Sequence, residues 1–373
     1  MPECAASHLK FLDLFLSSGF KSLKKIDDLK DDLEKVGRDA LLPGLGADKA
    51  KKLLAACVAE TSLLSAIYWI CCSYALLGHE VDSERRQRIL TFIASCRGAS
   101  GAFAPHPAQR EELLSTVSAV QLAVLLGEPE LLEVSKVAAY IRSLQLPDGS
   151  FTPFRGAGES QGDCRFTFAA LCAMTLLKQL GGSDAEHPDD SELCDAHAAT
   201  ADWLLQCQNL DGGFGCRPRE CESHAGHTFC CLAALSLLGR LDGLSHRGRG
   251  RLLRWLAARQ TPQGGMNGRP GKKPDVCYTW WTLAAAQLAE SLVDSRLSDI
   301  FDLNALQKFV HLCMADQGGI GPHPEDDPDP FHTFFGLAGL SLCAGDHGVL
   351  ALERMEPTLV LPVGLLKGSA KVS

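Results

Sequence analysis

The sequence predicts an all-α protein: an α/α toroid, a barrel of six helical hairpins around a central apolar cavity. A glycine-containing turn recurs five times along the chain, and two kinds of helical segment alternate around it. Repeated helix pairs must stack to bury their apolar faces, which an open solenoid and a closed ring both achieve. We favour the closed ring because six strongly apolar segments would line one cavity, and we expect almost no β-strand.

Each recurring turn closes on an apolar residue, and these residues are spaced 48, 63, 52 and 54 positions apart. Glycine permits the left-handed backbone that ends a helix or makes a tight turn. The five turns are GASGAF (98–103), PDGSF (147–151), LDGGFG (210–215), PQGGM (262–266) and DQGGI (316–320).

An amphipathic segment precedes each turn, and a more uniformly apolar segment follows it after a polar loop. A helix that is apolar on all sides belongs in the interior, and an amphipathic helix belongs at the surface. The expected outer helices contain RQRILTFIASC, VSKVAAYIRSLQ, AATADWLLQCQ, RLLRWLAARQ and LNALQKFVHLC. The expected inner helices contain SAIYWICCSYALLG, STVSAVQLAVLLG, FTFAALCAMTLL, HTFCCLAALSLLG, YTWWTLAAAQLA and HTFFGLAGLSLC.

The repeat sets the expected domain limits. Residues 51–345 form the toroid domain. Residues 1–50 are charged and locally amphipathic, so we expect an N-terminal extension that is partly helical or disordered. Residues 346–373 are expected to be a C-terminal tail, and the acidic segment 181–195 is expected to be a solvated insert between repeats.

Composition excludes several classes of protein. The net charge is −9, and nucleic-acid affinity needs clustered Lys and Arg, so we expect no nucleic-acid binding. No run of about 18 apolar residues occurs, so we expect no membrane span. The start MPECAASHLKFLDLF lacks the features of a secretory signal. The 16 cysteines are therefore expected to be reduced thiols, mostly buried, in a cytoplasmic protein.

Side chains with catalytic potential occur at the start of successive expected inner helices. Equal phase in a closed repeat ring means equal height, so these groups should gather at one rim of the cavity. They are Asp163, Arg165, His224, His227, Asp275, Cys277, Tyr278, Asp329 and His332.

Asp275, Cys277 and His332 are a candidate zinc site. Carboxylate, thiolate and imidazole are all ordinary Zn²⁺ ligands, and three protein ligands leave the fourth position open. Taken alone, Cys277 would more often be a core residue and His332 a helix cap.

A basic cluster beside this trio is a candidate anion site. Several hydrogen-bond donors around one point suit a diphosphate. The donors are Arg269, Lys272, His224, Tyr278 and Arg165. The alternative is a solvated basic loop. Below the rim, a set of apolar side chains would project inward and line a pocket or pack as core. They are Trp69, Phe168, Phe229, Cys230, Trp280 and Trp281.

Three segments together resemble the β subunits of protein prenyltransferases, most closely the Rab geranylgeranyltransferase (type II) branch. They are LDGGFGCRP…ESHAGHTFCC (210–231), GGMNGRPGKKPDVCYTWW (264–281) and DPFHTFFGLAGLSL (329–342). The resemblance extends over about residues 60–345. It implies an α/α toroid and a zinc ion held by Asp275, Cys277 and His332.

The resemblance also implies roles for further residues. Diphosphate contacts would come from His224, Arg269, Lys272 and Tyr278, with Tyr278 also counted among the catalytic residues. Arg165, Cys230 and Trp281 would line the isoprenoid pocket. Ser65 and Val117 stand where farnesyl enzymes carry bulky aromatic residues, so the tunnel should be deep enough for a twenty-carbon chain.

The implied activity is transfer of a geranylgeranyl group from geranylgeranyl diphosphate to C-terminal cysteines of Rab-type GTPases. Zinc, one ion per chain, would activate the cysteine as a thiolate. The implied partners are a prenyltransferase α subunit and an escort protein that presents the Rab GTPase. Pro322 stands where some relatives carry an aspartate implicated in Mg²⁺ binding, which argues against a protein-bound Mg²⁺ there.

Three alternatives remain open from the sequence. The chain could be the β subunit of a type I geranylgeranyltransferase or a farnesyltransferase, which act on CaaX proteins. It could be a terpene cyclase on a related ring, although such an enzyme has no use for Cys277 with His332. It could also be a scaffold without catalytic activity, although all the expected ligands are present.

Overall fold

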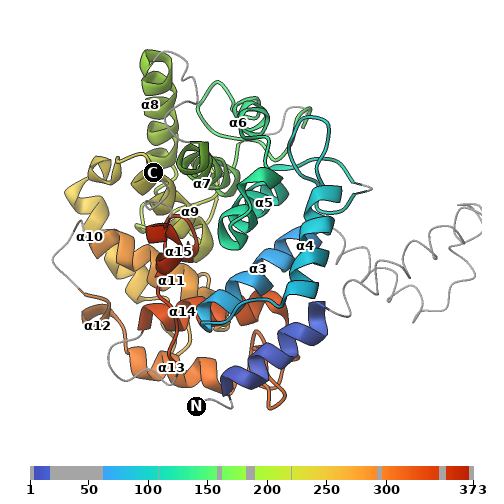
Figure 1. The fold of residues 1–373 in the computed structure, drawn as a ribbon. Coiled ribbons are helices and arrows are strands. Elements are labelled where there is room, and N and C mark those ends of the chain that lie inside the picture. The colour runs from blue at the N-terminus through green and yellow to red at the C-terminus, as the bar shows by residue number, and fades with distance from the viewer. Residues whose placement is uncertain are drawn as a thin grey trace, which may run out of the picture.

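The inner wall of the molecule is a closed ring of apolar helices (Figure 1). The computed structural model describes residues 4–16, 62–107, 109–157, 162–181, 190–219, 221–290, 292, 296–343 and 350–368. The inner helices are α3 (Leu63–Leu76), α5 (Leu113–Leu126), α7 (Cys164–Gly181), α9 (Ala225–Leu237), α11 (Cys277–Glu290) and α14 (Pro330–Cys343). Each packs against the next, and α14 packs against α3. The predicted toroid and its six inner helices are confirmed.

Amphipathic helices surround this ring. In α6 the buried side chains are Val137, Ala138, Tyr140 and Ile141, while the charged ones face outward. The outer helices are α4 (Ser83–Ser95), α6 (Val134–Arg142), α8 (Asp190–Gln206), α10 (His246–Ala257) and α13 (Leu303–Leu312). Shorter elements are η2 (Pro129–Leu131), η4 (Leu241–Gly243) and α12 (Leu297–Ile300). Of the acidic insert 181–195, residues 182–189 lie outside the described part, and α8 begins directly after them.

Each of the five glycine turns closes with a single antiparallel bridge, between Arg97 and Phe103 in the first and at the equivalent places in the other four. The turn glycine is needed for two reasons. Gly149 has φ +87°, and a Cβ there would overlap the backbone of Thr200 on α8, the next outer helix. In four turns the buried N–H of the closing residue donates to a threonine hydroxyl of the following inner helix. The pairs are Phe103–Thr116, Phe151–Thr167, Phe214–Thr228 and Ile320–Thr333.

A helix at residues 4–16 occupies the remaining place in the outer ring. A Cβ on Gly318, in the last glycine turn, would overlap the backbone of Ser7, as the other turn glycines overlap their next outer helix. Gly319 N–H donates to Nδ1 of the buried His8 at 2.9 Å. On the other side, Asp13 forms an ion pair with Arg85 of α4 at 3.1 Å. This segment was predicted to belong to an N-terminal extension at residues 1–50, whereas it completes the outer ring. Residues 17–50 lie outside the described part.

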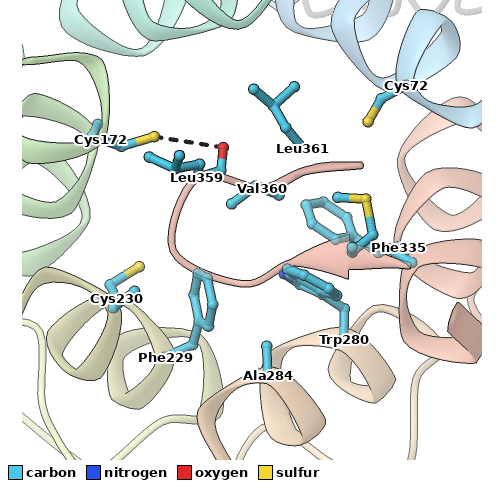
Figure 2. Packing of buried hydrophobic residues seen from close by; sticks show 14 of the residues in the cluster. Cys72, Cys172, Phe229, Cys230, Trp280, Ala284, Phe335, Leu359, Val360 and Leu361 are labelled. Carbon is cyan, nitrogen blue, oxygen red and sulfur yellow. Dashed lines mark hydrogen bonds between the residues drawn. The ribbon is translucent and has the colours of Figure 1, made fainter. Parts of the chain in front are cut away.

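A short hairpin near the C-terminus lies inside the ring of helices (Figure 2), and Met355 N–H donates to Ser341 Oγ near the C-terminal end of α14. It comprises β1 (Met355–Glu356) and β2 (Leu361–Pro362) and is followed by α15 (Val363–Gly368). Gln121 Nε2 donates to Leu359 O at 2.9 Å, and Tyr68 donates to Val360 O. The repeat predicted a toroid that ends at residue 345, but Leu359, Val360 and Leu361 belong to its core. The physical reason is that the ring has an open lumen, which this apolar run fills.

The described residues contain no helix with the length and hydropathy needed to cross a lipid bilayer.

Candidate active site

Asp275, Cys277 and His332 come together at the rim of the ring, at the starts of α11 and α14. Their ligand atoms all lie within 4.8 Å of one another. Asp275 and Cys277 converge although they are two residues apart, because Asp275 precedes the helix and its Oδ1 accepts from Cys277 N–H at 2.9 Å. Carboxylate, thiolate and imidazole form a donor set that suits a metal ion of the zinc type. The predicted trio can therefore hold a metal.

Asp329 fixes the orientation of His332. Pro330 begins α14, and Oδ1 of Asp329 accepts from His332 N–H at 2.9 Å as a helix cap. Oδ2 of the same carboxylate lies 2.6 Å from Nδ1 of His332. The imidazole then faces Asp275 with Nε2, 3.3 Å from Oδ1. A carboxylate on the second nitrogen of a ligating histidine is the usual support for metal binding. The sequence placed Asp329 at the rim but gave it no role.

Without a cation, the trio favours a protonated imidazole and a neutral thiol. Burial lowers the pKa of His332, but the hydrogen bonds that its ring donates to Asp275 and Asp329 outweigh burial and raise this pKa to about 9. Burial raises the pKa of the Cys277 thiol, and the charge of Asp275 raises it further. A divalent cation would take the place of the imidazolium proton and favour the thiolate. The electrostatics of the site thus match its donor set.

His224 and Tyr278 form a donor pair beside the trio. His224 precedes α9, and its Nδ1 accepts from Gly226 N–H at 3.2 Å. Burial, followed by the charges of His227 and Arg269, lowers the pKa of His224 to about 4, so the ring is neutral. Its Nε2–H can then donate to Tyr278 Oη, 3.1 Å away. The phenolic hydrogen of Tyr278 is left for a ligand.

The loop before α11 is shaped around the tyrosine. Gly268 packs so closely that a Cβ there would overlap the ring of Tyr278. Arg269 follows and forms an ion pair with Glu222, with about two fifths of its side chain exposed. Lys272 is exposed and joins this loop through its backbone, accepting from Asn267 Nδ2 at 3.1 Å. The structure therefore gathers Arg269 with His224 and Tyr278, and leaves the Lys272 ammonium free in solvent on the same loop. Sequence reasoning missed Glu222, whose signal was its position two residues before His224.

One cavity of about 490 Å³ connects these groups with the interior of the ring. His224, Tyr278 and Cys277 lie on its wall. The predicted pocket residues that line it are Ser65, Val117, Arg165, Cys230 and Trp281, together with Trp69 and Phe168. Arg165 is also held by Asp163, at 2.7 Å. A second cavity of about 540 Å³, between α3, α4 and α15, has none of the trio in its wall.

Two of the predicted inward-facing aromatic residues do not line the cavity. Phe229 and Trp280 are fully buried and project inward beside the hairpin within the ring (Figure 2). Consecutive residues on a helix point about 100° apart, so Trp280 cannot share the direction of Trp281. The sequence missed Phe331 and Phe335, which complete an aromatic wall; the ring centres of Trp281 and Phe335 are 4.4 Å apart. Their signal was their place one residue before and three residues after His332. Phe335, Cys230 and Val360 also line this cavity, and Figure 2 shows these side chains within the ring.

The place considered for Mg²⁺ offers no side-chain ligand at Pro322, whose carbonyl accepts from Val276 N–H at 3.1 Å. The acidic residues that follow, Glu325, Asp326 and Asp327, are exposed, and Asp326 pairs with His323 at 2.8 Å. These contacts are those of a solvated acidic loop.

The chain matches a family model described as the prenyltransferase alpha-alpha toroid domain over residues 49–361. It is 36% identical over 304 residues to the geranylgeranyl transferase type-2 subunit beta of Saccharomyces cerevisiae, covering 80% of this chain and 85% of that protein. It is 33% identical to the protein farnesyltransferase subunit beta of Schizosaccharomyces pombe, covering 78% and 74%. Among solved structures, Candida albicans protein geranylgeranyltransferase-I complexed with GGPP has a TM-score of 0.68 at 22% identity, covering 88% of this chain and 95% of that one. At this identity the likeness concerns the fold alone.

Proposed function

This chain belongs to the prenyltransferase β-subunit family, and from that premise we propose that it is the β subunit of a heterodimeric protein geranylgeranyltransferase of the Rab type. It transfers a geranylgeranyl group from geranylgeranyl diphosphate to C-terminal cysteines of Rab-type GTPases. One observation carries the proposal: a single cavity meets a metal-ligand trio and a set of anion donors at its mouth and is apolar below. An amphiphilic diphosphate and a thiol acceptor fit such a cavity together.

The apolar wall supports a long donor. Ser65 and Val117 lie on neighbouring inner helices, α3 and α5, and both are small. The Ser65 hydroxyl is already satisfied by Ser118, at 3.0 Å, so it presents little polarity to an isoprenoid. A bulky aromatic residue at either position would shorten the tunnel by volume exclusion. The small residues therefore favour the twenty-carbon chain over the fifteen-carbon one.

Asp275, Cys277 and His332 would hold the zinc ion, with Asp329 supporting His332. When bound, zinc supplies a positive charge that lowers the pKa of an incoming cysteine thiol, so that a thiolate is present at neutral pH. The protein residues position this thiol beside the inner cavity, because Cys277 belongs to both the trio and the cavity wall.

Leaving-group stabilisation falls to the donor pair and the basic loop. Negative charge grows on the diphosphate oxygens as the bond to carbon breaks, and donors already in place stabilise that charge. The Tyr278 hydroxyl, oriented by His224, is one such donor. Arg269 is a second, once the diphosphate replaces Glu222 as its partner, and Lys272 is a third. His224 and Tyr278 line the cavity, and the charge of Arg269 acts on both, which supports these roles.

The proposed partners are an α subunit, an escort protein and its Rab GTPase. The names of the relatives as β subunits support the first of these. A second candidate function is that of a farnesyltransferase or type I β subunit, which the similarity to the fission-yeast protein favours.

Co-purification with a candidate α chain, followed by paired transfer assays, tests the proposal. The proposal expects faster turnover with the twenty-carbon than with the fifteen-carbon diphosphate, and modification of a Rab–escort complex rather than a short CaaX peptide. Preference for the CaaX peptide would overturn the Rab assignment, and preference for the shorter donor would favour the second candidate.

A further inference from the structure

Two cysteine sulfurs meet in the loop that joins the third glycine turn to α9. The Sγ atoms of Cys216 and Cys221 are 3.1 Å apart. This is about 1 Å longer than the ~2.05 Å bond of a disulfide. Both cysteines are free thiols, and both are half-buried rather than enclosed.

Hydrogen bonds to the backbone carbonyls of both cysteines fix the two parts of the loop that carry the sulfurs. Cys216 O accepts from Cys164 N–H at 2.9 Å. Cys221 O accepts from Asn209 Nδ2 at 2.9 Å. Gly215 brings the two parts of the loop into contact, since a Cβ there would lie 2.7 Å from Cys221 O. Bond formation therefore requires the two sulfurs to approach by about 1 Å while these backbone contacts stay in place.

Accessibility distinguishes this pair from the other thiols of the described residues. Cys164 is in hydrogen-bonding contact with Cys230 and Cys231, but all three are buried. Among the described cysteines, Cys4 is the other half-buried one, and its sulfur contacts His8 rather than a second thiol. An oxidant from solvent reaches Cys216 and Cys221 together.

The loop also leads directly to the candidate anion site. Cys221 is followed by Glu222, the ion-pair partner of Arg269, and His224 lies two residues further along. A covalent bond at Cys221 would restrain Glu222 where it meets Arg269. A diphosphate would then have to compete with a more firmly held carboxylate.

We propose that Cys216 and Cys221 form a reversible disulfide in response to a peroxide, and that the disulfide weakens diphosphate binding by holding Glu222 on Arg269. The second part rests on the proposed function; the first part does not.

Cys221 is the attacking thiol, because burial and contact with Cys221 raise the pKa of Cys216 to about 12. The Cys221 thiolate attacks one oxygen of hydrogen peroxide and the O–O bond breaks, which gives a Cys221 sulfenic acid while the other oxygen leaves as water. The Cys216 sulfur then loses its proton and attacks the Cys221 sulfur, and the sulfenic oxygen leaves as the second water. The two thiols are oxidised, one peroxide is reduced to two waters, and a dithiol reductant reverses the change.

Peptide mapping of the full-length chain tests the disulfide. Trypsin cleaves after Arg219 but not between Arg217 and Pro218, so the bond joins two tryptic peptides that separate on reduction. We expect the joined peptides after mild hydrogen peroxide treatment, their loss in Cys216→Ser and in Cys221→Ser, and their persistence in the control Cys4→Ser. Zinc content, measured in parallel, shows whether Cys277 has been left intact. Absence of the joined peptides in the wild-type chain would overturn the proposal.

Calorimetric binding of inorganic pyrophosphate tests the coupling. We expect oxidised wild-type protein to bind at least threefold more weakly than reduced protein, and we expect Glu222→Gln to remove the difference. A mapped disulfide with unchanged affinity would overturn the coupling. Reduced protein that binds no pyrophosphate would count against both the proposed diphosphate site and the coupling, while the peptide map would still decide the disulfide.

Discussion

Acid should weaken the closure of the outer ring, because His8 must be neutral to make its contact. Nδ1 of His8 accepts from Gly319 N–H, which a protonated imidazole cannot do. Burial, followed by the charge of His311, lowers the pKa of His8 from 6.5 to about 4. The folded-state pKa is depressed, so this stability is fully present above pH 6.5 and is lost as the pH falls toward 4.

The size of the effect follows from the two pKa values. At pH 5 the unfolded chain carries the proton on His8 and the folded protein does not, which lowers the free energy of unfolding by about 2 kcal/mol relative to pH 7. The assay is urea unfolding followed by circular dichroism at both pH values. His8→Asn retains an acceptor for Gly319 but does not titrate, so its loss between pH 7 and pH 5 should be about 2 kcal/mol smaller than that of the wild type.

The half-exposed His323 provides the matched control. His323→Asn should keep the wild-type pH dependence, because it leaves the contact between His8 and Gly319 intact. Other titrating groups contribute equally to the wild type and to each variant, so they cancel in the comparison. Equal pH dependence in the wild type and His8→Asn would refute the role given to His8.

Further predictions concern the cavity and its mouth. Gly268→Ala should displace Tyr278 and reduce pyrophosphate affinity measured by calorimetry, while Gly250→Ala, whose Cβ would meet no atom nearer than 3.9 Å, should leave that affinity unchanged; equal losses would contradict the close-packing argument. Val117→Trp should shift donor preference toward the fifteen-carbon diphosphate in competition assays, and an unchanged ratio would remove Val117 from the tunnel. Arg269→Ala should cost roughly 1.5–3 kcal/mol in diphosphate binding or transfer, and unchanged kinetics would exclude Arg269 from the anion site.

Most of the fold could be predicted from the local spacing of apolar residues and from the position of each residue within the repeat. The five turns and six inner helices follow from apolar spacing and from glycines such as Gly149, which the backbone requires. Cys277 and His332 lie close together because each stands near the start of an inner helix, and these starts lie at the same end of a closed ring. These features depend on short segments that repeat, so a sequence displays them directly.

Features that depend on a single long-range contact were not predictable in the same way. In the sequence, the helix at residues 4–16 resembles a charged extension. Its place in the outer ring is set by the close packing of Gly318 on its backbone and by the hydrogen bond from Gly319 to His8. In the sequence, Val360 resembles part of a tail. It is a core residue because the ring of helices leaves a lumen that this segment fills. The pairing of Glu222 with Arg269 joins two polar loops, and polar loops have no periodicity from which a partner could be inferred.

The proposed function depends on Asp275, Cys277 and His332 sharing one metal ion. Metal analysis of the purified full-length chain and of His332→Ala, with the helical signal recorded on the same samples, tests this most directly. The expected result is about one zinc per wild-type chain and a large loss of zinc in His332→Ala, with the circular dichroism of both proteins alike. A His332→Ala chain that keeps its zinc, or a wild-type chain that never binds zinc, would contradict the account.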